Sequence, residues 1–306
     1  MAHPFRSSSG PAGRAVRRFT FPCLILIAAA TLAAQSRERT LYVTARDSTG
    51  ALAEALVPGD LVVREDGVAR EVLRVSRATA PLRIALLADN SAATSRHTSN
   101  FRDALKGFVA RFGPPHEIAY ITLGDRPTIV TEYTSGVDTL TRAVDRLFPQ
   151  SGSGAYVLDG ILEAARGLQK REAERSAIVV VATDGPEFSN VADGPVLDAI
   201  RAAGTALHVV LVQEHMTAAT SDEQRYRNIV FDRGTIESGG SRDVVLTSMA
   251  LPSALQAVAD GLLGQFALPF ARPPTLIPPE RVTVSAARPG LVVRGTAARA
   301  PAGGLP

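Results

Sequence analysis

Three polar side chains follow the ends of two strand-like segments of this sequence. Asp89 and Ser91 come directly after the segment 83–88, and Asp184 follows the apolar run 177–182. In an open α/β sheet, ligands bind outside the carboxyl ends of the strands, where the strand order reverses. We therefore expect two carboxylates and a hydroxyl to arrive together at one end of neighbouring strands, where they could bind a ligand.

The same residues offer little for catalysis. Ser91 follows a strand, but nothing in the sequence identifies its base, and the Gly-x-Ser-x-Gly motif of α/β hydrolases is absent. His116-Glu117 lacks the second histidine of a zinc-protease helix. His208 lies inside an apolar segment and is interpreted as a structural histidine. We expect no enzymatic activity and keep a serine hydrolase that uses Ser91 as the least favoured alternative.

Residues 81–268 show strands alternating with amphipathic helices, which is typical of a mostly parallel sheet covered on both faces. The first helix places Phe101, Leu105 and Phe108 on one apolar face, and another is marked by Leu140, Val144, Leu147 and Phe148. The strands are predicted at 83–88, 118–123, 128–133, 177–182, 207–212 and 243–246. The segment 128–133 follows a tight turn, so we expect it to be antiparallel at a sheet edge. The predicted fold class is therefore α/β, with a doubly wound, mostly parallel sheet.

The flanks of this domain are predicted to be β-structure. Short strands are expected in the segment 36–80, at 41–45, 60–64 and 72–75, and in the segment 281–306, at 281–286 and 290–294. We expect the two ends to pair as one small β subdomain. The Pro-rich stretch 269–280, which joins the α/β domain to the second of these segments, is interpreted as a linker.

Residues 1–35 have the three parts of a secretory signal peptide: an Arg-containing start, an apolar run and small residues before a cleavage site. We expect cleavage near residues 35–37 and export, to the periplasm, the envelope or the medium, with no stable membrane span afterwards. The alternative is an uncleaved anchor, although the run is short for a span of about 20 residues. Cys23 is the only cysteine, so the mature chain would have no disulfide, thiolate metal site or cysteine nucleophile.

The alkaline character of the chain is concentrated in this leader. The whole sequence has 33 basic and 30 acidic side chains, a formal charge of +3. Residues 1–35 hold four arginines and no acidic residue, so the remainder has 29 basic and 30 acidic side chains, a charge of −1. The remainder shows no basic stripe of the kind that neutralises phosphates, so we expect no nucleic-acid partner.

Over most of the mature length the sequence resembles the von Willebrand factor A family, in particular exported bacterial VWFA-related proteins. In that family one strand ends in Asp-x-Ser-x-Ser, a later loop supplies a Thr, and another strand ends in Asp-Gly. Together these residues hold Mg²⁺ or Mn²⁺ at a metal-ion-dependent adhesion site. Asp89, Ser91 and Asp184 match this pattern. Three flanking segments extend the resemblance: REDGVAREV at 64–72, ESGG at 237–240 and RPGLVVR at 288–294.

Two positions depart from the family pattern. Ala93 stands where the second Ser is expected, and Ala155 stands where the Thr is expected. Because Mg²⁺ prefers six oxygens in near-octahedral array, the loss of two hydroxyls should lower its affinity steeply. The resemblance thus implies a degenerate site that binds Mg²⁺ or Mn²⁺ weakly or not at all. Restoring Ala93→Ser and Ala155→Thr is expected to strengthen Mg²⁺ binding by about tenfold or more. Glu187 and Asp159 are interpreted as solvated or capping residues.

The resemblance implies a non-catalytic binding module that presents the loop face around Asp89, Ser91, Ala155 and Asp184 to a protein outside the cytoplasm. The alternative is a metal-independent structural or assembly protein of the cell envelope, in which the β subdomain or the Pro-rich tail makes the contacts. Cation-dependent partner binding would separate the first function from the second. The sequence does not identify the partner.

Overall fold

The structure is a computed structural model that describes residues 37–214, 219–273 and 281–297 of the 306-residue chain. The predicted signal peptide, its cleavage site, residues 274–280 of the predicted linker and the last nine residues lie outside this description. Among the described helices, none is long and apolar enough to cross a membrane.

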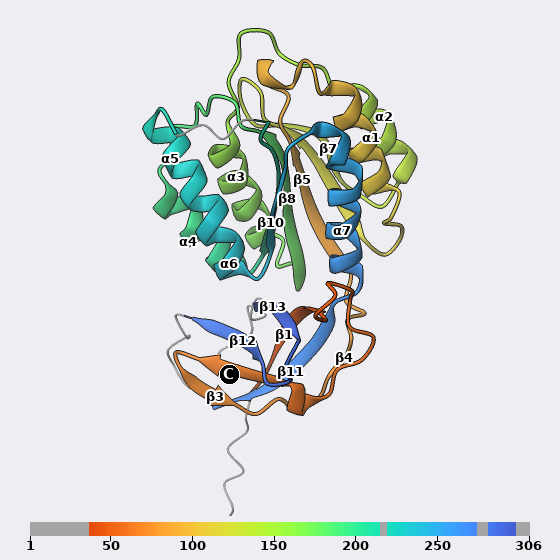
Figure 1. The fold of residues 1–306 in the computed structure, drawn as a ribbon, viewed down its shortest axis with the longest axis vertical. Helices are drawn as coiled ribbons and strands as arrows, with labels where there is room; N and C mark the ends of the chain where they lie inside the picture. Colours follow the sequence, from red (N-terminus) through yellow and green to blue (C-terminus); the bar gives the residue numbers. More distant parts are fainter. Residues whose placement is uncertain (1–36, 215–218, 274–280, 298–306) are drawn as a thin grey trace, which may run out of the picture. The chain divides into compact units, whose positions relative to one another are not determined.

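A six-stranded sheet forms the centre of the α/β domain (Figure 1). Its strand order is β10-β9-β8-β5-β6-β7, and only β7 runs antiparallel to its neighbour. The strands are β5 (Leu82–Ala88), β6 (Glu117–Thr122), β7 (Thr128–Thr134), β8 (Arg175–Thr183), β9 (Ala206–Val212) and β10 (Ser241–Val245). Every residue of β8 is buried, as an apolar central strand covered on both faces must be. The predicted antiparallel edge strand is confirmed in β7.

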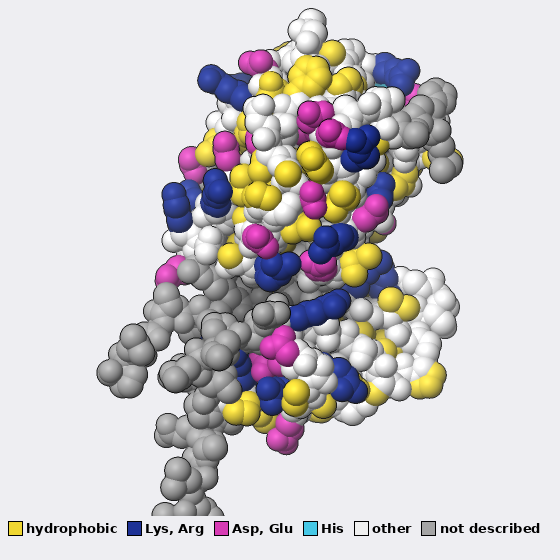
Figure 2. All heavy atoms as spheres, turned by 90° about the vertical axis from the view of Figure 1, so that its left-hand side faces the viewer, with side chains coloured by type: hydrophobic (Ala, Val, Ile, Leu, Met, Phe, Trp, Pro, Cys, Tyr) yellow, Lys and Arg dark blue, Asp and Glu magenta, His cyan; other side chains and the backbone are white. Residues whose placement is uncertain are grey.

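Helices cover both faces of this sheet, which confirms the predicted fold class (Figure 1). One face carries α1 (Thr98–Val109), α2 (Val137–Asp145) and α7 (Leu251–Leu263), and the other carries α3 (Val157–Lys170), α4 (Asp193–Ala203), α5 (Asp222–Ile229) and α6 (Thr235–Ser238). Alternation along β5 supplies both cores, since Ile84 and Leu86 enter the first and Ala85 and Leu87 enter the second. Over the side that carries α4 to α6, basic and acidic side chains are interspersed (Figure 2).

Two glycines follow α6 and let the chain pass close to the sheet. A π-helical turn, Val230–Gly234, joins the two helices. Gly239 ends α6 in the left-handed conformation with φ of 76°, which a glycine adopts without steric cost. A Cβ on Gly240 would lie 1.8 Å from the carbonyl oxygen of Leu207 in β9. Only a residue without a side chain lets the chain pass this close to β9.

The two flanking segments form a β subdomain with its own core, as predicted. One sheet has the order β13-β1-β11-β4 and the other the order β12-β2-β3. The strands are β1 (Arg37–Arg46), β2 (Leu61–Glu65), β3 (Val68–Arg70), β4 (Ser76–Arg77), β11 (Phe266–Arg272), β12 (Val282–Ala286) and β13 (Val292–Ala297). Leu41 and Val43 of β1 pack with Leu268 and Phe270 of β11 in this core.

Two details of the β subdomain differ from the sequence-based expectations. The predicted strand 72–75 is wrong: the regular strand is β3, and Val72 makes only an isolated bridge to Phe270. The linker assignment is wrong for residues 269–272, which belong to β11. Pro269 fits this strand because its carbonyl oxygen accepts from the Leu73 amide, on the side away from β1. The missing N–H would point to that same side, so the pairing with β1 loses no hydrogen bond.

The α/β domain is inserted between two neighbouring strands of the β subdomain. The chain enters it after β4 and leaves it into β11. Those two strands pair with each other, Ser76 opposite Ala267 and Arg77 opposite Phe266. The entrance and exit therefore lie side by side.

Candidate functional site

Three loops meet at the carboxyl ends of β5 and β8, which are adjacent parallel strands. The amide of Ala92 donates to the Ser153 carbonyl at 3.2 Å, and the amide of Gln150 donates to the Asn90 carbonyl at 2.8 Å. The amide of Ala155 donates to the Pro186 carbonyl at 3.0 Å. These bonds join the segments 89–95, 148–156 and 184–190 into one surface, which we call the loop face. Asp89, Ser91 and Asp184 all lie in it.

Asp89 is fully buried and ties the first of these strands to its neighbour. Its Oδ1 accepts from the Ser91 amide at 2.8 Å. Its Oδ2 accepts from the Thr183 amide at 3.1 Å and from the Thr183 hydroxyl at 2.7 Å. Both carboxylate oxygens thus have protein donors. The Ser91 hydroxyl is also buried and has no hydrogen-bond partner in the part of the chain that the structure describes.

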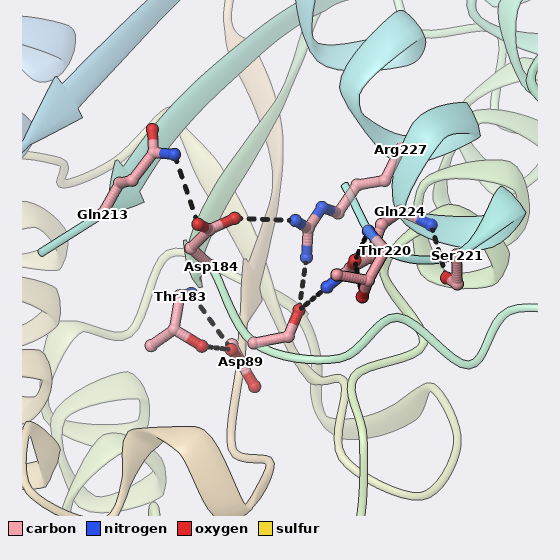
Figure 3. Close-up of polar contacts among 9 residues, drawn as sticks. Asp89, Thr183, Asp184, Gln213, Thr220, Ser221, Gln224 and Arg227 are labelled. Carbon is pink, nitrogen blue, oxygen red and sulfur yellow. Dashed lines mark hydrogen bonds and ion pairs between the residues drawn. The ribbon is translucent and has the colours of Figure 1, made fainter. Parts of the chain in front are cut away.

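Asp184 lies between two side chains from other elements (Figure 3). Arg227 Nη2 donates to its Oδ1 at 3.0 Å, and Gln213 Nε2 donates to its Oδ2 at 3.2 Å. The Arg227 side chain is only 1% exposed and Asp184 is 20% exposed, so this ion pair is largely withdrawn from water. The carboxylate that resembles a metal ligand is therefore engaged by a guanidinium of the same chain.

Helix α5 aims Arg227 at this carboxylate. Ser221 caps the helix by accepting from the Gln224 amide at 3.2 Å. Gln224 and Arg227 are three residues apart, on one face of the helix, and both reach the Gly185 carbonyl, at 3.4 and 2.8 Å. Arg227 was not among the residues predicted for this site. A signal was present, because Arg227 precedes Val230 and Phe231 by three and four residues and so shares their buried face.

Alanine methyl groups stand at the two positions that depart from the family pattern. Ala155 is 2% exposed and belongs to the core on the α3 side, while its backbone bridges Gly124 and Glu187. Ala93 packs against the loop after β8, where a Cβ on Gly185 would come within 2.6 Å of the Ala93 Cβ. Neither residue offers an oxygen from its side chain.

Glu187 caps helix α3 rather than facing a ligand. Its Oε1 accepts from the amides of Val157 at 2.9 Å, Leu158 at 3.4 Å and Ser189 at 3.3 Å. Burial raises the pKa of this carboxyl to about 7, although hydrogen bonding from Ser189 and the nearby Arg227 charge oppose the shift. Asp159 accepts from the Asn190 amide at 3.3 Å. The capping interpretation is confirmed for Glu187, whereas Asp159 binds the loop after β8 instead of a helix end.

The side-chain oxygens at this site are a poor match to the six-oxygen shell that Mg²⁺ prefers. Asp89 accepts three hydrogen bonds, Asp184 is paired with Arg227, and Ala93 and Ala155 supply no side-chain oxygen. The Ser91 hydroxyl is the one matching ligand that lacks a hydrogen bond within the described residues. No cluster of three or more His, Cys, Asp or Glu side chains that could hold a metal occurs in the ranges that the structure covers.

A serine and a histidine that are distant in the sequence meet beside the loop face. His97 Nδ1 lies 3.0 Å from the Ser248 hydroxyl. Arg96 Nε donates to His97 Nε2 at 3.1 Å, and Glu214 Oε1 lies 3.7 Å from the same nitrogen. In the tautomer that accepts the Arg96 bond, His97 carries its proton on Nδ1 and donates it to Ser248. Burial lowers the pKa of His97 and favours this neutral form. Asn100 also donates to Ser248, at 2.8 Å. The serine is thus an acceptor, the opposite of an activated nucleophile.

His208 occupies a buried position in β9, as its interpretation as a structural histidine requires. Its Nδ1 lies 3.0 Å from the Ser241 hydroxyl in β10. Burial lowers the pKa of His208 to about 4, and the Arg294 charge adds to the shift. This histidine is therefore neutral at physiological pH.

Two phenylalanine rings are exposed on the loop face. Phe148 is 64% exposed and Phe188 is 48% exposed. The prediction that Leu147 and Phe148 belong to a helix is wrong, because α2 ends at Asp145. The Arg102 guanidinium lies 4.5 Å from the centre of the Phe148 ring, and Phe188 packs edge-on against Tyr156 at 6.3 Å. The rings are held in place and still present apolar surface to solvent.

Comparisons with known proteins agree with this architecture. The family model described as von Willebrand factor type A domain matches residues 84–238. No curated protein matches the sequence significantly. Among solved structures, a von Willebrand factor type A protein from Catenulispora acidiphila has 12% identity and a TM-score of 0.48, with 86% of this chain and 72% of that chain covered.

Two further solved structures are similar over shorter stretches. An aerotolerance-related membrane protein from Bacteroides fragilis has 16% identity and a TM-score of 0.45, with 59% of this chain and 98% of that chain covered. Proximal thread matrix protein 1 from the mussel byssus has 18% identity and a TM-score of 0.48, with 65% of this chain and 50% of that chain covered.

Proposed function

Because the chain belongs to the von Willebrand factor type A domain family, we propose that it is a non-catalytic module that binds a protein partner through the loop face. The observation that carries the proposal is the pair of exposed rings, Phe148 and Phe188, on loops tied to the ends of β5 and β8. Exposed aromatic rings on a rigid support are typical centres of protein interfaces, because they bury much area at little entropic cost.

The surroundings of the two serines support a binding function over hydrolysis. Ser91 has no basic partner among the described residues, and Ser248 accepts from both His97 and Asn100. A nucleophilic serine needs an adjacent base that takes its proton. Neither serine has this arrangement, so hydrolysis is the least favoured function.

We place this module outside the cytoplasm. The support is the signal-like composition of residues 1–35 and the confinement of the only cysteine to that segment. Amino-terminal sequencing of the protein from its producing cells tests this location. A mature chain that begins near residues 35–37 is expected, and an intact Met1 on envelope-associated protein would contradict cleavage.

A pull-down from the envelope fraction of the producing cells tests the binding function. The bait is the mature chain, and the matched variants are Phe148→Ala, Phe188→Ala and Ile236→Ala. Ile236 is 76% exposed but lies in α6, whose end contacts the start of β9, away from the loop face. We expect the two phenylalanine variants to lose a partner that wild type and Ile236→Ala retain.

The same experiment separates the competing functions. If both phenylalanine variants keep the partner and Val68→Ser loses it, the β subdomain makes the contact, as in an assembly protein. Val68 is 55% exposed and lies in β3, an edge strand. Turnover of an ester or peptide library that Ser91→Ala abolishes would establish the hydrolase instead.

A further inference from the structure

We infer that Arg227 takes the place of the divalent cation in the loop face, so that the protein carries its own fixed positive charge where related sites bind a metal. The inference rests on the proposed function only in that it concerns the same face. Its consequence is that partner binding needs neither Mg²⁺ nor Mn²⁺.

Arg227 places its positive charge on Asp184, one of the three residues that match the family's ligand pattern. Its guanidinium donates to an Asp184 carboxylate oxygen at 3.0 Å and to the Gly185 carbonyl at 2.8 Å. Both acceptors belong to the Asp-Gly pair that ends β8. The guanidinium therefore neutralises the carboxylate and fixes the loop after β8 through the neighbouring backbone oxygen.

The surroundings of Arg227 stabilise its buried charge. Arg227 is 1% exposed, and a buried guanidinium is costly unless it is paired and hydrogen-bonded. Gln213 holds the other oxygen of Asp184, and Gln224 from the same helix face supports the Gly185 carbonyl. The charge of Arg227 also lowers the pKa of Glu187 against the effect of burial. One guanidinium thus compensates two acidic groups.

A divalent ion would have to displace this arrangement. Binding to Asp184 would require the guanidinium to leave its carboxylate partner, and no other carboxylate forms an ion pair with Arg227 within the described residues. The displaced charge would then lie unpaired in a buried position. This cost adds to the loss of the two hydroxyls at Ala93 and Ala155. Restoring those hydroxyls alone, which the sequence suggested would strengthen Mg²⁺ binding, is therefore insufficient.

The same geometry defines the chemistry of the partner. A metal at an adhesion site keeps an open position that an acidic residue of the partner can fill. Arg227 has no such position, since its side chain is buried. The exposed large apolar side chains of the loop face are the rings of Phe148 and Phe188, and exposed polar residues such as Gln150 and Asn190 lie on the same segments. The partner therefore needs apolar side chains opposite the two rings, and it needs no carboxylate to complete a metal shell.

Titration with Mn²⁺, read by calorimetry and by the shift in melting temperature, tests the inference without any partner. The proteins are the mature wild type, Ala93→Ser/Ala155→Thr, the same pair with Arg227→Met, and a control that combines the pair with Arg225→Met. Arg225 is two residues away on α5 and 59% exposed, where it pairs with Asp222. The Arg227→Met triple variant is expected to bind Mn²⁺ at least about tenfold more tightly than the other three. Adding Asp184→Asn to it should abolish the gain.

Two results would overturn the inference. One is Mn²⁺ binding by wild type or by the hydroxyl-restored pair as tight as that of the Arg227→Met triple variant. The other is an equal gain from Arg225→Met. If Arg227→Met does not fold, Arg227→Met/Asp184→Asn removes both charges, and a surrogate cation predicts that this double variant is more stable than Arg227→Met alone. Because no partner is present, failure here leaves the pull-down result unaffected.

Discussion

The methyl group of Ala93 occupies the space into which a side chain on Gly185 would project. A Cβ on Gly185 would lie 2.6 Å from the Ala93 Cβ and 3.2 Å from the Thr183 hydroxyl oxygen. Real Cβ atoms do not approach so closely. The loop after β5 and the loop after β8 thus touch through the smallest side chains available.

This contact predicts that Gly185→Ala destabilises the protein by about 1–3 kcal/mol, the usual cost of overpacking. Ala93→Gly in the same chain should recover part of the loss, because it removes the atom that clashes. Chemical denaturation of the two single variants and the double variant measures the coupling. Simple additivity of the two effects would mean that the loops move apart instead of clashing.

Glu187→Gln is expected to stabilise the protein at high pH. The pKa of Glu187 is raised from 4.5 to about 7, so its contribution is fully present below pH 4.5 and is lost as the pH rises through 7. A glutamine keeps an oxygen that can cap α3 but has no charge to bury. The unfolding free energy of the variant should therefore exceed that of wild type by up to about 3 kcal/mol at pH 8. Urea unfolding at pH 4.5 and pH 8 checks this, and a difference that does not grow with pH would refute it.

His208 should have the opposite pH dependence. Its pKa is lowered from 6.5 to about 4, so its contribution is present above pH 6.5 and is lost as the pH falls towards 4. His208→Leu removes this proton uptake, so wild type should lose more stability than the variant between those pH values, by up to about 3 kcal/mol. Melting curves at pH 7 and pH 4.5 give the comparison. Parallel declines in the two proteins would show that His208 does not titrate in this range.

A buried carboxylate in the β subdomain gives a prediction about stability alone. Glu65 is 3% exposed and pairs with Arg70 at 2.9 Å and with Arg272 at 3.3 Å. Glu65→Gln removes the buried charge that both Arg70 and Arg272 contact and should cost roughly 3 kcal/mol. Glu38→Gln is the control, because its pair with Arg74 is about half exposed and such pairs contribute little. Equal effects of the two variants in denaturant titrations would contradict the buried network.

The alternation of strands and helices was predictable because burial imposes a simple period on the sequence. The run of β8 is apolar throughout since both of its faces are covered, and the face of α1 repeats Phe101, Leu105 and Phe108 at helical spacing. The meeting of Asp89, Ser91 and Asp184 followed from the same pattern. Parallel strands bring their carboxyl ends to one edge, and β5 and β8 lie next to each other.

What the sequence did not reveal depends on contacts between distant segments. Arg227 meets Asp184 only because α5 packs beside the loop after β8, and no local period encodes that contact. Proline usually indicates a loop, so the sequence predicts a linker at Pro269. In the structure the side of Pro269 that lacks an N–H faces away from β1, and the strand pairing is kept. Phe148 was assigned to a helix by its neighbours, although the helix ends before it.

The pairing of β1 with β13 determines how the protein would respond to mechanical load. Leu41 lies opposite Ala297 and Arg46 opposite Val292, so the start of one strand is beside the end of the other. Tension applied through the chain on either side of residues 37 and 297 would pull on both strands from the same end and open their hydrogen bonds one after another. The α/β domain, inserted between β4 and β11, would bear no tension during this step. In a force–extension measurement the bonds of residues 37–40 to β11 and the β1–β13 ladder would therefore open in succession, at low force, with the loop face still folded.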